Sequence, residues 1–209
     1  MSEARVCVLD MGMGNLRSVA RALARAGGAP EITADPAAAR GFDRLVVPGQ
    51  GAFRDCAAAL SGPLGEVIRE HIAAERPYLG ICLGMQALFE SSAEAPGAAG
   101  LGIFAGTVDR LEPGEDPDEP GRRLKVPHMG WNQVEGSHPL LPERDWFYFV
   151  HSYACVPADP PIVVGRAQYG GPVCAAVARG HVFACQFHPE KSQRAGAALL
   201  ERFLEGRWS

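Results

Sequence analysis

The sequence lacks several features that would place a protein in the membrane, outside the cell or on nucleic acid. None of its apolar runs approaches the roughly 18 residues that a membrane-spanning helix needs. Its start, MSEARVCVLDMGMGN, has no cationic segment followed by a long apolar one, so a signal peptide is not expected. The 20 Lys and Arg residues are outnumbered by 24 Asp and Glu, which argues against a nucleic-acid-binding surface. We therefore expect a cytoplasmic protein with neither a membrane nor a nucleic-acid partner.

The short motifs of metal and nucleotide sites are also missing. The six cysteines include no C-x-x-C pair, which argues against a structural zinc site and against a disulfide scaffold. No G-x-x-x-x-G-K-[ST] segment is present. GMGNLR begins like the dinucleotide fingerprint G-x-G-x-x-G but places Arg17 at its last position, so nucleotide binding there is a weak alternative. We expect no metal and no cofactor.

In the first half of the chain, apolar strands alternate with amphipathic helices. Strands are predicted over 5–10, 43–49 and 77–82, and helices over 15–27, 62–75 and about 84–91. Gly27 and Gly28 are predicted to end the first helix. This alternation is typical of a parallel sheet with helices on both faces.

In the second half, strands follow one another with turns between them. Strand-like stretches are found at 103–111, 145–151, 162–167, 173–178 and 181–187, and a helix is predicted over 192–206. The predicted fold class is therefore α/β, a doubly wound and mostly parallel sheet with antiparallel strands added in the second half. We expect residues 1–209 to form a single domain.

The stretch YLGICLGMQ at 78–86 places a cysteine where an apolar strand gives way to a helical pattern. In a nucleophile elbow the chain turns sharply at this point and lifts the central side chain above the sheet. Gly80 and Gly84 occupy the two crowded positions, which leaves Cys82 at the centre. We expect Cys82 to be a nucleophile and the N–H of Leu83 to be an oxyanion donor. The other five cysteines lie in apolar contexts and are expected to be buried and inert.

A cysteine nucleophile needs a base, and His188 in CQFHPEKS is the best candidate. Glu190 follows two residues later, and residues i and i+2 of an extended segment point the same way, so its carboxylate is expected to orient the imidazole. The remaining five histidines are weaker candidates for the base. His71 is expected to be solvated in its helix, His138 lies in a turn and His181 opens a strand. His128 and His151 lack a carboxylate two residues on.

The segment VVPGQGAF follows the strand at 43–49 and carries glycines in a P-G-x-G pattern. Gly49 and Gly51 let a peptide plane reorient without a Cβ penalty, so a backbone N–H of Gly49, Gln50 or Gly51 is a candidate second oxyanion donor. The alternative interpretation of this segment is a tight turn between a strand and a helix with no catalytic role.

A P-G-x-G loop, a G-x-C-x-G elbow and a late H-P-E, in this order, resemble class I glutamine amidotransferase domains. Longer strings are similar to glutaminase subunits of imidazole glycerol phosphate synthases, and the likeness runs from about residue 5 to 206. These strings are DMGMGNLRSV (10–19), VPGQGAF (47–53), GICLGMQALFE (80–90), KVPHMGWN (125–132), FVHSY (149–153) and CQFHPEKS (185–192). Gln50 departs from this resemblance, because valine is common at its position.

The resemblance implies hydrolysis of L-glutamine to glutamate and ammonia by a catalytic triad of Cys82, His188 and Glu190. It also implies that Gln86 and Glu94 bind the substrate, together with backbone groups of Ser152 and Tyr153. The ammonia would pass through a channel to a (β/α)8-barrel cyclase subunit, which forms a heterodimer with the glutaminase in histidine biosynthesis. Residues placed toward this partner are Asn15, Ser18, Pro127, Met129, Trp131 and Tyr148. Asn15 also reads as the N-cap of a helix.

Two alternatives remain from the sequence. One is a class I amidotransferase subunit that serves another biosynthetic pathway. The other is a cysteine-bearing α/β domain that binds or senses a ligand without catalysis.

Overall fold

The structure is a computed structural model, and it describes residues 4–116, 119 and 121–208. Its helices are α1 (Leu16–Arg25), α2 (Pro36–Ala39), α3 (Phe53–Leu60), α4 (Pro63–Ala73), α5 (Leu83–Gln86) and α6 (Gln193–Glu205), with short 3-10 turns η1 (Pro160–Ile162) and η2 (Pro189–Lys191). Its strands are β1 (Ala4–Leu9), β2 (Gly28–Thr33), β3 (Arg44–Gly49), β4 (Tyr78–Cys82), β5 (Ser91–Ser92), β6 (Gly106–Arg110), β7 (His128–Gly136), β8 (Arg144–His151), β9 (Tyr153–Pro157), β10 (Val163–Gln168), β11 (Pro172–Arg179) and β12 (Val182–Cys185).

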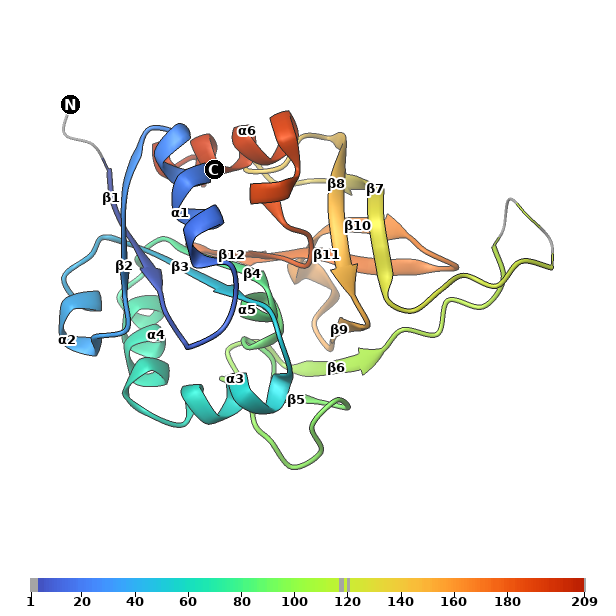
Figure 1. Ribbon diagram of the computed structural model, residues 1–209, viewed down its shortest axis with the longest axis horizontal. Helices are drawn as coiled ribbons and strands as arrows, with labels where there is room; N and C mark the ends of the chain where they lie inside the picture. Colours follow the sequence, from blue (N-terminus) through green and yellow to red (C-terminus); the bar gives the residue numbers. More distant parts are fainter. Residues whose placement is uncertain (1–3, 117–118, 120, 209) are drawn as a thin grey trace.

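One large sheet runs through the molecule in the order β2-β1-β3-β4-β12-β11-β10-β7-β8. The pairings from β2 to β12 are parallel, and those from β12 to β8 are antiparallel. A smaller sheet, β5-β6-β9, lies beside the large one (Figure 1). The last strand of the parallel half, β12, comes from near the end of the chain, so residues that follow β12 lie next to residues that follow β4.

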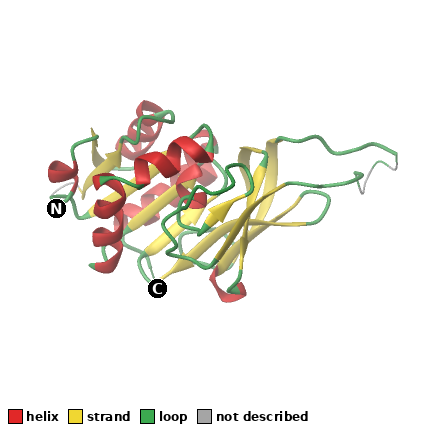
Figure 2. Ribbon diagram, turned by 90° about the horizontal axis from the view of Figure 1, so that it is seen from below, coloured by secondary structure: helices red, strands yellow, loops and turns green. Residues whose placement is uncertain are grey.

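The parallel half of the sheet is covered by helices on both faces, as predicted. α1 and α6 lie over one face and α3 and α4 over the other (Figure 1). Alternate residues of β1 show this division, because Val6 and Val8 pack with Leu23 of α1, whereas Cys7 and Leu9 belong to the core on the opposite face. In Figure 2 most of the helices lie at the end of the molecule that holds the parallel strands. The long antiparallel strands form the opposite end.

Local signals explain where several helices begin and end. Asn15 caps α1, since its side chain accepts a hydrogen bond from the N–H of Ser18. Asp35 caps α2 in the same way, and Pro63 occupies the first turn of α4. Gly206 ends α6 in the left-handed conformation with φ +75°.

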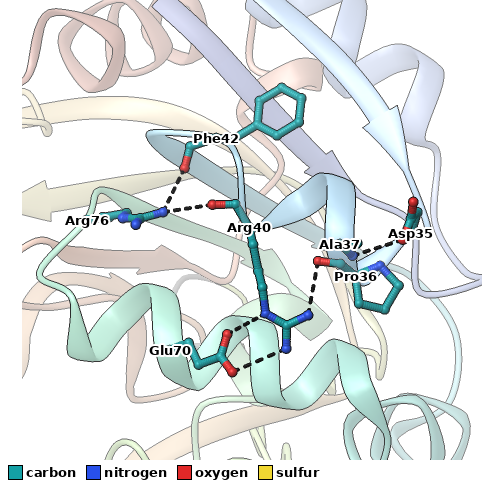
Figure 3. A network of polar contacts seen from close by, with 7 residues as sticks. All are labelled: Asp35, Pro36, Ala37, Arg40, Phe42, Glu70 and Arg76. Carbon is teal, nitrogen blue, oxygen red and sulfur yellow. Dashed lines mark hydrogen bonds and ion pairs between the residues drawn. The ribbon is translucent and has the colours of Figure 1, made fainter.

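A polar network ties the short helix α2 to α4 (Figure 3). The guanidinium of Arg40 forms two hydrogen bonds with the carboxylate of Glu70, and Arg76 donates to the carbonyl oxygens of Arg40 and Phe42. Nearby, His71 lies 4% exposed with its Nε2 3.0 Å from the carbonyl oxygen of Pro77. The expectation that His71 is solvated is therefore wrong, because the helix presents it to the chain that enters β4.

Most predicted elements are present, with shifted ends. The helix predicted over about 84–91 is wrong in extent, because α5 ends at Gln86 and the chain then turns toward the small sheet. Gly28, predicted to end a helix, instead begins strand β2. Elements that the sequence pattern did not predict are β2, α2, α3, β5, β7 and β9. Among the described residues no helix has both the length and the apolar character needed to cross a membrane.

Candidate active site

Cys82 lies at the corner where β4 meets α5. Its backbone has φ +54° and ψ −108°, a conformation that non-glycine residues rarely adopt. Its neighbour across the parallel pairing is Gly49, the last residue of β3. The thiol is 7% exposed and borders a cavity of about 440 Å³. The chain therefore holds this one side chain at the edge of the sheet, facing a space large enough for a small molecule.

The two glycines that flank Cys82 are required by close backbone contacts. A Cβ on Gly84 would lie 1.8 Å from the carbonyl oxygen of Val47, and one on Gly80 would lie 2.6 Å from that of Gly84. A Cβ on Gly49 would lie 2.7 Å from the Cβ of Leu83. The corner is therefore folded so tightly against β3 that only glycine fits at these positions, as the sequence pattern predicts.

His188 and Glu190 lie just beyond the end of β12, the strand beside β4. The ring Nδ1 of His188 is 2.9 Å from Oε1 of Glu190, and the two side chains are 2% and 1% exposed. Because a carboxylate only accepts, Nδ1 carries the proton and Nε2 is directed elsewhere. Nε2 makes no hydrogen bond of standard geometry with any described residue. The imidazole is thus oriented by the carboxylate and has one nitrogen free to exchange a proton.

The contact between His188 and Glu190 forms for a different local reason than the sequence suggested. His188 is extended, but Glu190 lies in the 3-10 turn η2, so the pair does not belong to one continuous strand. Ser192 holds this turn, since its hydroxyl donates to the carbonyl of His188 and accepts from the N–H of Tyr148. The predicted pairing is confirmed, and its cause is the turn.

The charge around His188 favours its protonated form. Burial lowers the pKa of His188, but the neighbouring Cys82 thiol and Glu190 carboxylate outweigh burial and raise this pKa to about 9. An imidazolium next to a sulfur atom is the environment that promotes a thiolate. His188 can therefore act as a proton donor beside the sulfur at neutral pH.

The other five cysteines behave as the sequence predicts. All are buried and free: Cys7, Cys56, Cys155, Cys174 and Cys185. Burial raises the pKa of the Cys7, Cys56 and Cys174 thiols to about 12 and that of the other two also well above its ordinary value. Thiols that stay protonated are poor nucleophiles, so we expect none of the five to compete for reaction.

The cavity brings together the residues that were expected to bind a substrate. Its lining includes Gln50, Gly51, Leu83, Gln86, Glu94, Ser152 and Tyr153, beside the thiol of Cys82. One oxygen of Glu94 accepts a hydrogen bond from the N–H of Phe53, which fixes the carboxylate against the start of α3. Gly49 does not line the cavity but lies directly behind it, next to Cys82 in the sheet.

Several residues at this site were not identified from the sequence. Lys191 and His151 also line the cavity, and the buried side chain of Gln186 contacts the sulfur of Cys82. Gln186 precedes His188 by two residues, so the same alternation that singled out Glu190 gives a signal for it.

The residues that were expected to face a partner come from the start of α1, the strands β7 and β8, and the chain just before β7. Met129 and Trp131 of β7 are 62% and 44% exposed, and Tyr148 of β8 is half-buried with its ring against Trp131. Pro127 is exposed and also lines the cavity. Asn15 is exposed and Ser18 half-buried at the start of α1.

Comparison with known proteins gives matches over almost the whole chain. Residues 7–206 match the family model described as "Glutamine amidotransferase class-I". The chain is 52% identical to the imidazole glycerol phosphate synthase subunit HisH of Methylococcus capsulatus, an alignment that covers 97% of this chain and 96% of that protein. It is 48% identical to the subunit of the same name from Pseudomonas putida, with 97% and 99% covered.

Solved structures with lower identity share the fold. A chain described as PurLQS from Thermotoga maritima superposes with a TM-score of 0.75 at 18% identity and covers 98% of this chain and 99% of that one. A crystal structure of a glutamine amidotransferase gives a TM-score of 0.73 at 19% identity, with 95% and 97% covered.

Proposed function

Because the chain belongs to the class I glutamine amidotransferase family, we propose that it hydrolyses L-glutamine with a Cys82–His188–Glu190 triad. It is the glutaminase subunit of an imidazole glycerol phosphate synthase, an enzyme of histidine biosynthesis. The single observation that carries the proposed site is the arrangement of Cys82 at a strained corner, beside an imidazole whose Nδ1 lies 2.9 Å from a buried carboxylate.

The reaction proceeds in two halves. The Cys82 thiolate attacks the side-chain carboxamide carbon of glutamine, and His188 then protonates the departing nitrogen, which leaves as ammonia. The product of this half is a γ-glutamyl thioester on Cys82. Water, deprotonated by His188, attacks the thioester carbon and expels the thiolate, which releases glutamate. Glu190 keeps the imidazole in the tautomer and orientation that both proton transfers need.

Both halves pass through a tetrahedral intermediate with a negatively charged oxygen. We assign its stabilisation to the backbone N–H of Leu83 and to one of the loop Gly49–Gln50–Gly51. The position of these residues supports the assignment, because Leu83 and Gln50 border the cavity next to Cys82. The donor in the loop is a peptide group, so Gln50 can replace the valine common at this position.

L-Glutamine carries an α-ammonium and an α-carboxylate group at one end and a neutral carboxamide at the other, and the cavity has polar groups suited to them. We assign Glu94 and Gln86 to the glutamine substrate, with Glu94 facing its α-ammonium group. Backbone groups of Ser152 and Tyr153 are assigned to its polar atoms as well. These four residues line one cavity with Cys82 although they come from distant parts of the chain.

A partner subunit follows from the relatives, which are named as subunits of a synthase. We propose that the partner is a (β/α)8-barrel cyclase that forms a heterodimer with this chain. The cyclase would combine ammonia with phosphoribulosyl-formimino aminoimidazole carboxamide ribonucleotide, giving imidazole glycerol phosphate and aminoimidazole carboxamide ribonucleotide. Ammonia released into neutral water becomes ammonium, which is not a nucleophile, so a closed passage between subunits is needed. The exposed side chains of Met129 and Trp131 support an interface at β7.

The test is glutamine hydrolysis by the purified chain, alone and with the cyclase subunit bound to its own substrate. We expect slow hydrolysis by the free chain and a large acceleration in the complex. If a synthase from another amidotransferase pathway accelerates hydrolysis and the cyclase does not, the pathway assignment is wrong. If no partner yields glutamate from glutamine, the glutaminase proposal itself is wrong.

A further inference from the structure

The carbonyl oxygen of Tyr153 accepts two hydrogen bonds at the edge of the cavity. One comes from Nε2 of Gln86 at 3.1 Å, and the other from Nδ1 of His151 at 2.9 Å. A carbonyl oxygen has two lone pairs and cannot donate, so both partners must present an N–H to it. The backbone carbonyl of Tyr153 therefore fixes which of the two side-chain amide atoms of Gln86 is the nitrogen and which is the oxygen.

The orientation of the Gln86 amide determines the orientation of the side-chain amide of Gln186. Nε2 of Gln86 also lies 3.0 Å from the side chain of Gln186, and since Nε2 is a donor, the facing atom of Gln186 must be its Oε1. The amide nitrogen of Gln186 is then left pointing at the sulfur of Cys82, 3.5 Å away. The side chains of Gln86 and Gln186 thus form a row of hydrogen-bonded amides between the carbonyl of Tyr153 and the sulfur of Cys82. The direction of donation along this row leaves an N–H of Gln186 facing the sulfur.

Gln186 is fully buried, and its backbone is held by a hydrogen bond. Its side chain is 0% exposed, and its backbone N–H donates to the carbonyl of Ala175 at 2.9 Å. Two residues on, the N–H of His188 donates to the carbonyl of Tyr148 at 2.9 Å. The same short segment thus holds two groups against Cys82. His188 can exchange a proton at neutral pH, whereas the amide of Gln186 cannot lose one.

We propose that Gln186 is a further catalytic residue of the glutaminase reaction, which donates an N–H to the Cys82 sulfur whenever that sulfur is negatively charged. This role rests on the proposed function. Negative charge is present on the sulfur before it attacks the carboxamide and returns when the second tetrahedral intermediate expels it. A buried donor that is already aligned stabilises this charge without reorganisation, because the row of amides holds it in place.

The test is the pH dependence of alkylation of Cys82 by iodoacetamide in the full-length chain, with Gln186→Met and Gln186→Glu as variants. Met fills a similar volume without a donor or an acceptor. Glu keeps an acceptor for Gln86 but replaces the donor with a carboxylate oxygen, whose negative charge also opposes a charge on the sulfur, so the uncharged Met variant isolates loss of the donor. We expect the midpoint of the profile to move to higher pH in both. Alkylation at neutral pH should slow about tenfold or more, as for loss of a hydrogen bond to a charged group.

Glutamine turnover in the complex provides the second readout. We expect kcat to fall by about tenfold or more with a small change in KM, because the charge on sulfur develops during reaction. Gln168→Met is the control, since this glutamine is exposed and does not line the cavity, and it should leave both readouts unchanged. Thermal unfolding identifies any variant that does not fold, and the other variant then decides the test.

An unchanged alkylation profile in a folded Gln186 variant would overturn the proposal, even if turnover fell, because that result would leave only a packing role. Failure of the proposed function gives a different pattern. In that case the wild-type chain would show a reactive Cys82 and a shift on Gln186 substitution, yet no glutamate would form with any partner.

Discussion

At the scale of single residues, the conformation of Cys82 combines a cost in stability with a gain in function. A residue held at φ +54° and ψ −108° costs about 1–3 kcal/mol relative to ordinary backbone. The surrounding contacts keep it there, because Gly80 and Gly84 bring the backbone of the corner against β3 and against itself. The thiol consequently faces the cavity and not the core.

This strain can be measured with two inactive variants. Cys82→Ala and Cys82→Gly both remove the thiol, but glycine adopts a positive φ readily while alanine does not. We expect Cys82→Gly to have a free energy of unfolding about 1 kcal/mol higher than Cys82→Ala, after allowing for the greater entropy of unfolded glycine. Urea unfolding checks the difference, and a more stable alanine variant would show that the corner is not strained.

The glycine at position 84 gives a second test. A Cβ there meets the carbonyl oxygen of Val47, a backbone atom that cannot move away alone. Gly84→Ala is therefore expected to lower the free energy of unfolding by about 3 kcal/mol or more, and to abolish glutaminase activity in any folded fraction. Gly171→Ala is the control, because a Cβ at Gly171 meets nothing within 4 Å and should change stability little. Equal effects of the two substitutions would contradict the close packing of the corner.

The residues of the proposed triad could be selected from the sequence because local patterns mark them. The two glycines around Cys82 and the carboxylate two residues after His188 are visible in the sequence itself. Gln186 was not identified, because its role depends on contacts with Gln86 and with the carbonyl of Tyr153, which tertiary folding brings together. The alternation before His188 marks the position of Gln186, but it does not show that these distant segments meet there.

At the scale of elements, the pairing of β7 with β8 creates a second polar row beside the site. His128 and His151 are direct neighbours in the antiparallel register, with Nδ1 of His128 3.0 Å from Nε2 of His151. Asn132 donates from Nδ2 to Nε2 of His128, so His128 carries its proton on Nδ1. His128 donates this proton to Nε2 of His151, whose own proton lies on Nδ1 facing the carbonyl oxygen of Tyr153. Both rings are therefore neutral in the folded protein.

This row makes the stability of the protein dependent on pH. Burial lowers the pKa of His128 to about 3, and burial with a smaller effect of His188 lowers that of His151 to about 4. In the unfolded chain both take up protons below a pKa of about 6.5, so the stability they contribute is present above this pH and is lost as pH falls. We expect the free energy of unfolding to drop by roughly 1–2 kcal/mol per histidine between pH 7 and pH 5.

Urea unfolding at the two pH values measures this drop, and His128→Gln should remove about half of the histidine contribution. Equal stability of the wild-type chain at pH 7 and pH 5 would contradict neutral burial of the pair. His188 acts in the opposite direction. Its raised pKa of about 9 contributes stability that is present below 6.5 and is lost as pH rises through 9.

The elements themselves were predictable where hydrophobic period was strong, as in β3, β4, α4 and α6. The strand β7 was not predicted because it carries polar and glycine residues whose contacts form only in the folded protein. The strand β9 has only five residues and ends in proline, so its hydrophobic pattern is short. In β7, His128 stacks between Phe149 and Tyr169, and Asn132 donates to the carbonyl of Gln168. The helix after Cys82 was predicted too long, because its backbone is diverted after Gln86 into loop contacts with the small sheet.

At the scale of the whole molecule, the two edges of the large sheet differ in what they offer a partner. The β7–β8 end exposes Met129, Trp131 and Trp146, whereas β2 at the opposite edge exposes Ile32. Met129 pairs with Val150, a residue of the cavity lining. Under the proposed function the site needs a closed passage for ammonia, and exposed aromatic side chains at this end support a docking surface there.

We expect Trp131→Ala to weaken binding of the cyclase subunit about tenfold to a hundredfold, the range for a central aromatic residue of an interface, without lowering the thermal stability of the free chain. Ile32→Ala is the matched control at the far edge. Titration calorimetry with the purified cyclase compares the two. An effect of Ile32→Ala equal to that of Trp131→Ala would place the interface elsewhere.

The most direct test of the central claim is covalent labelling of the chain by the glutamine analogue 6-diazo-5-oxo-L-norleucine, in the presence of its partner, followed by peptide mass spectrometry. The account predicts one adduct, on Cys82, and none in Cys82→Ala. An adduct on any of the five other cysteines, or no adduct at all, would contradict it.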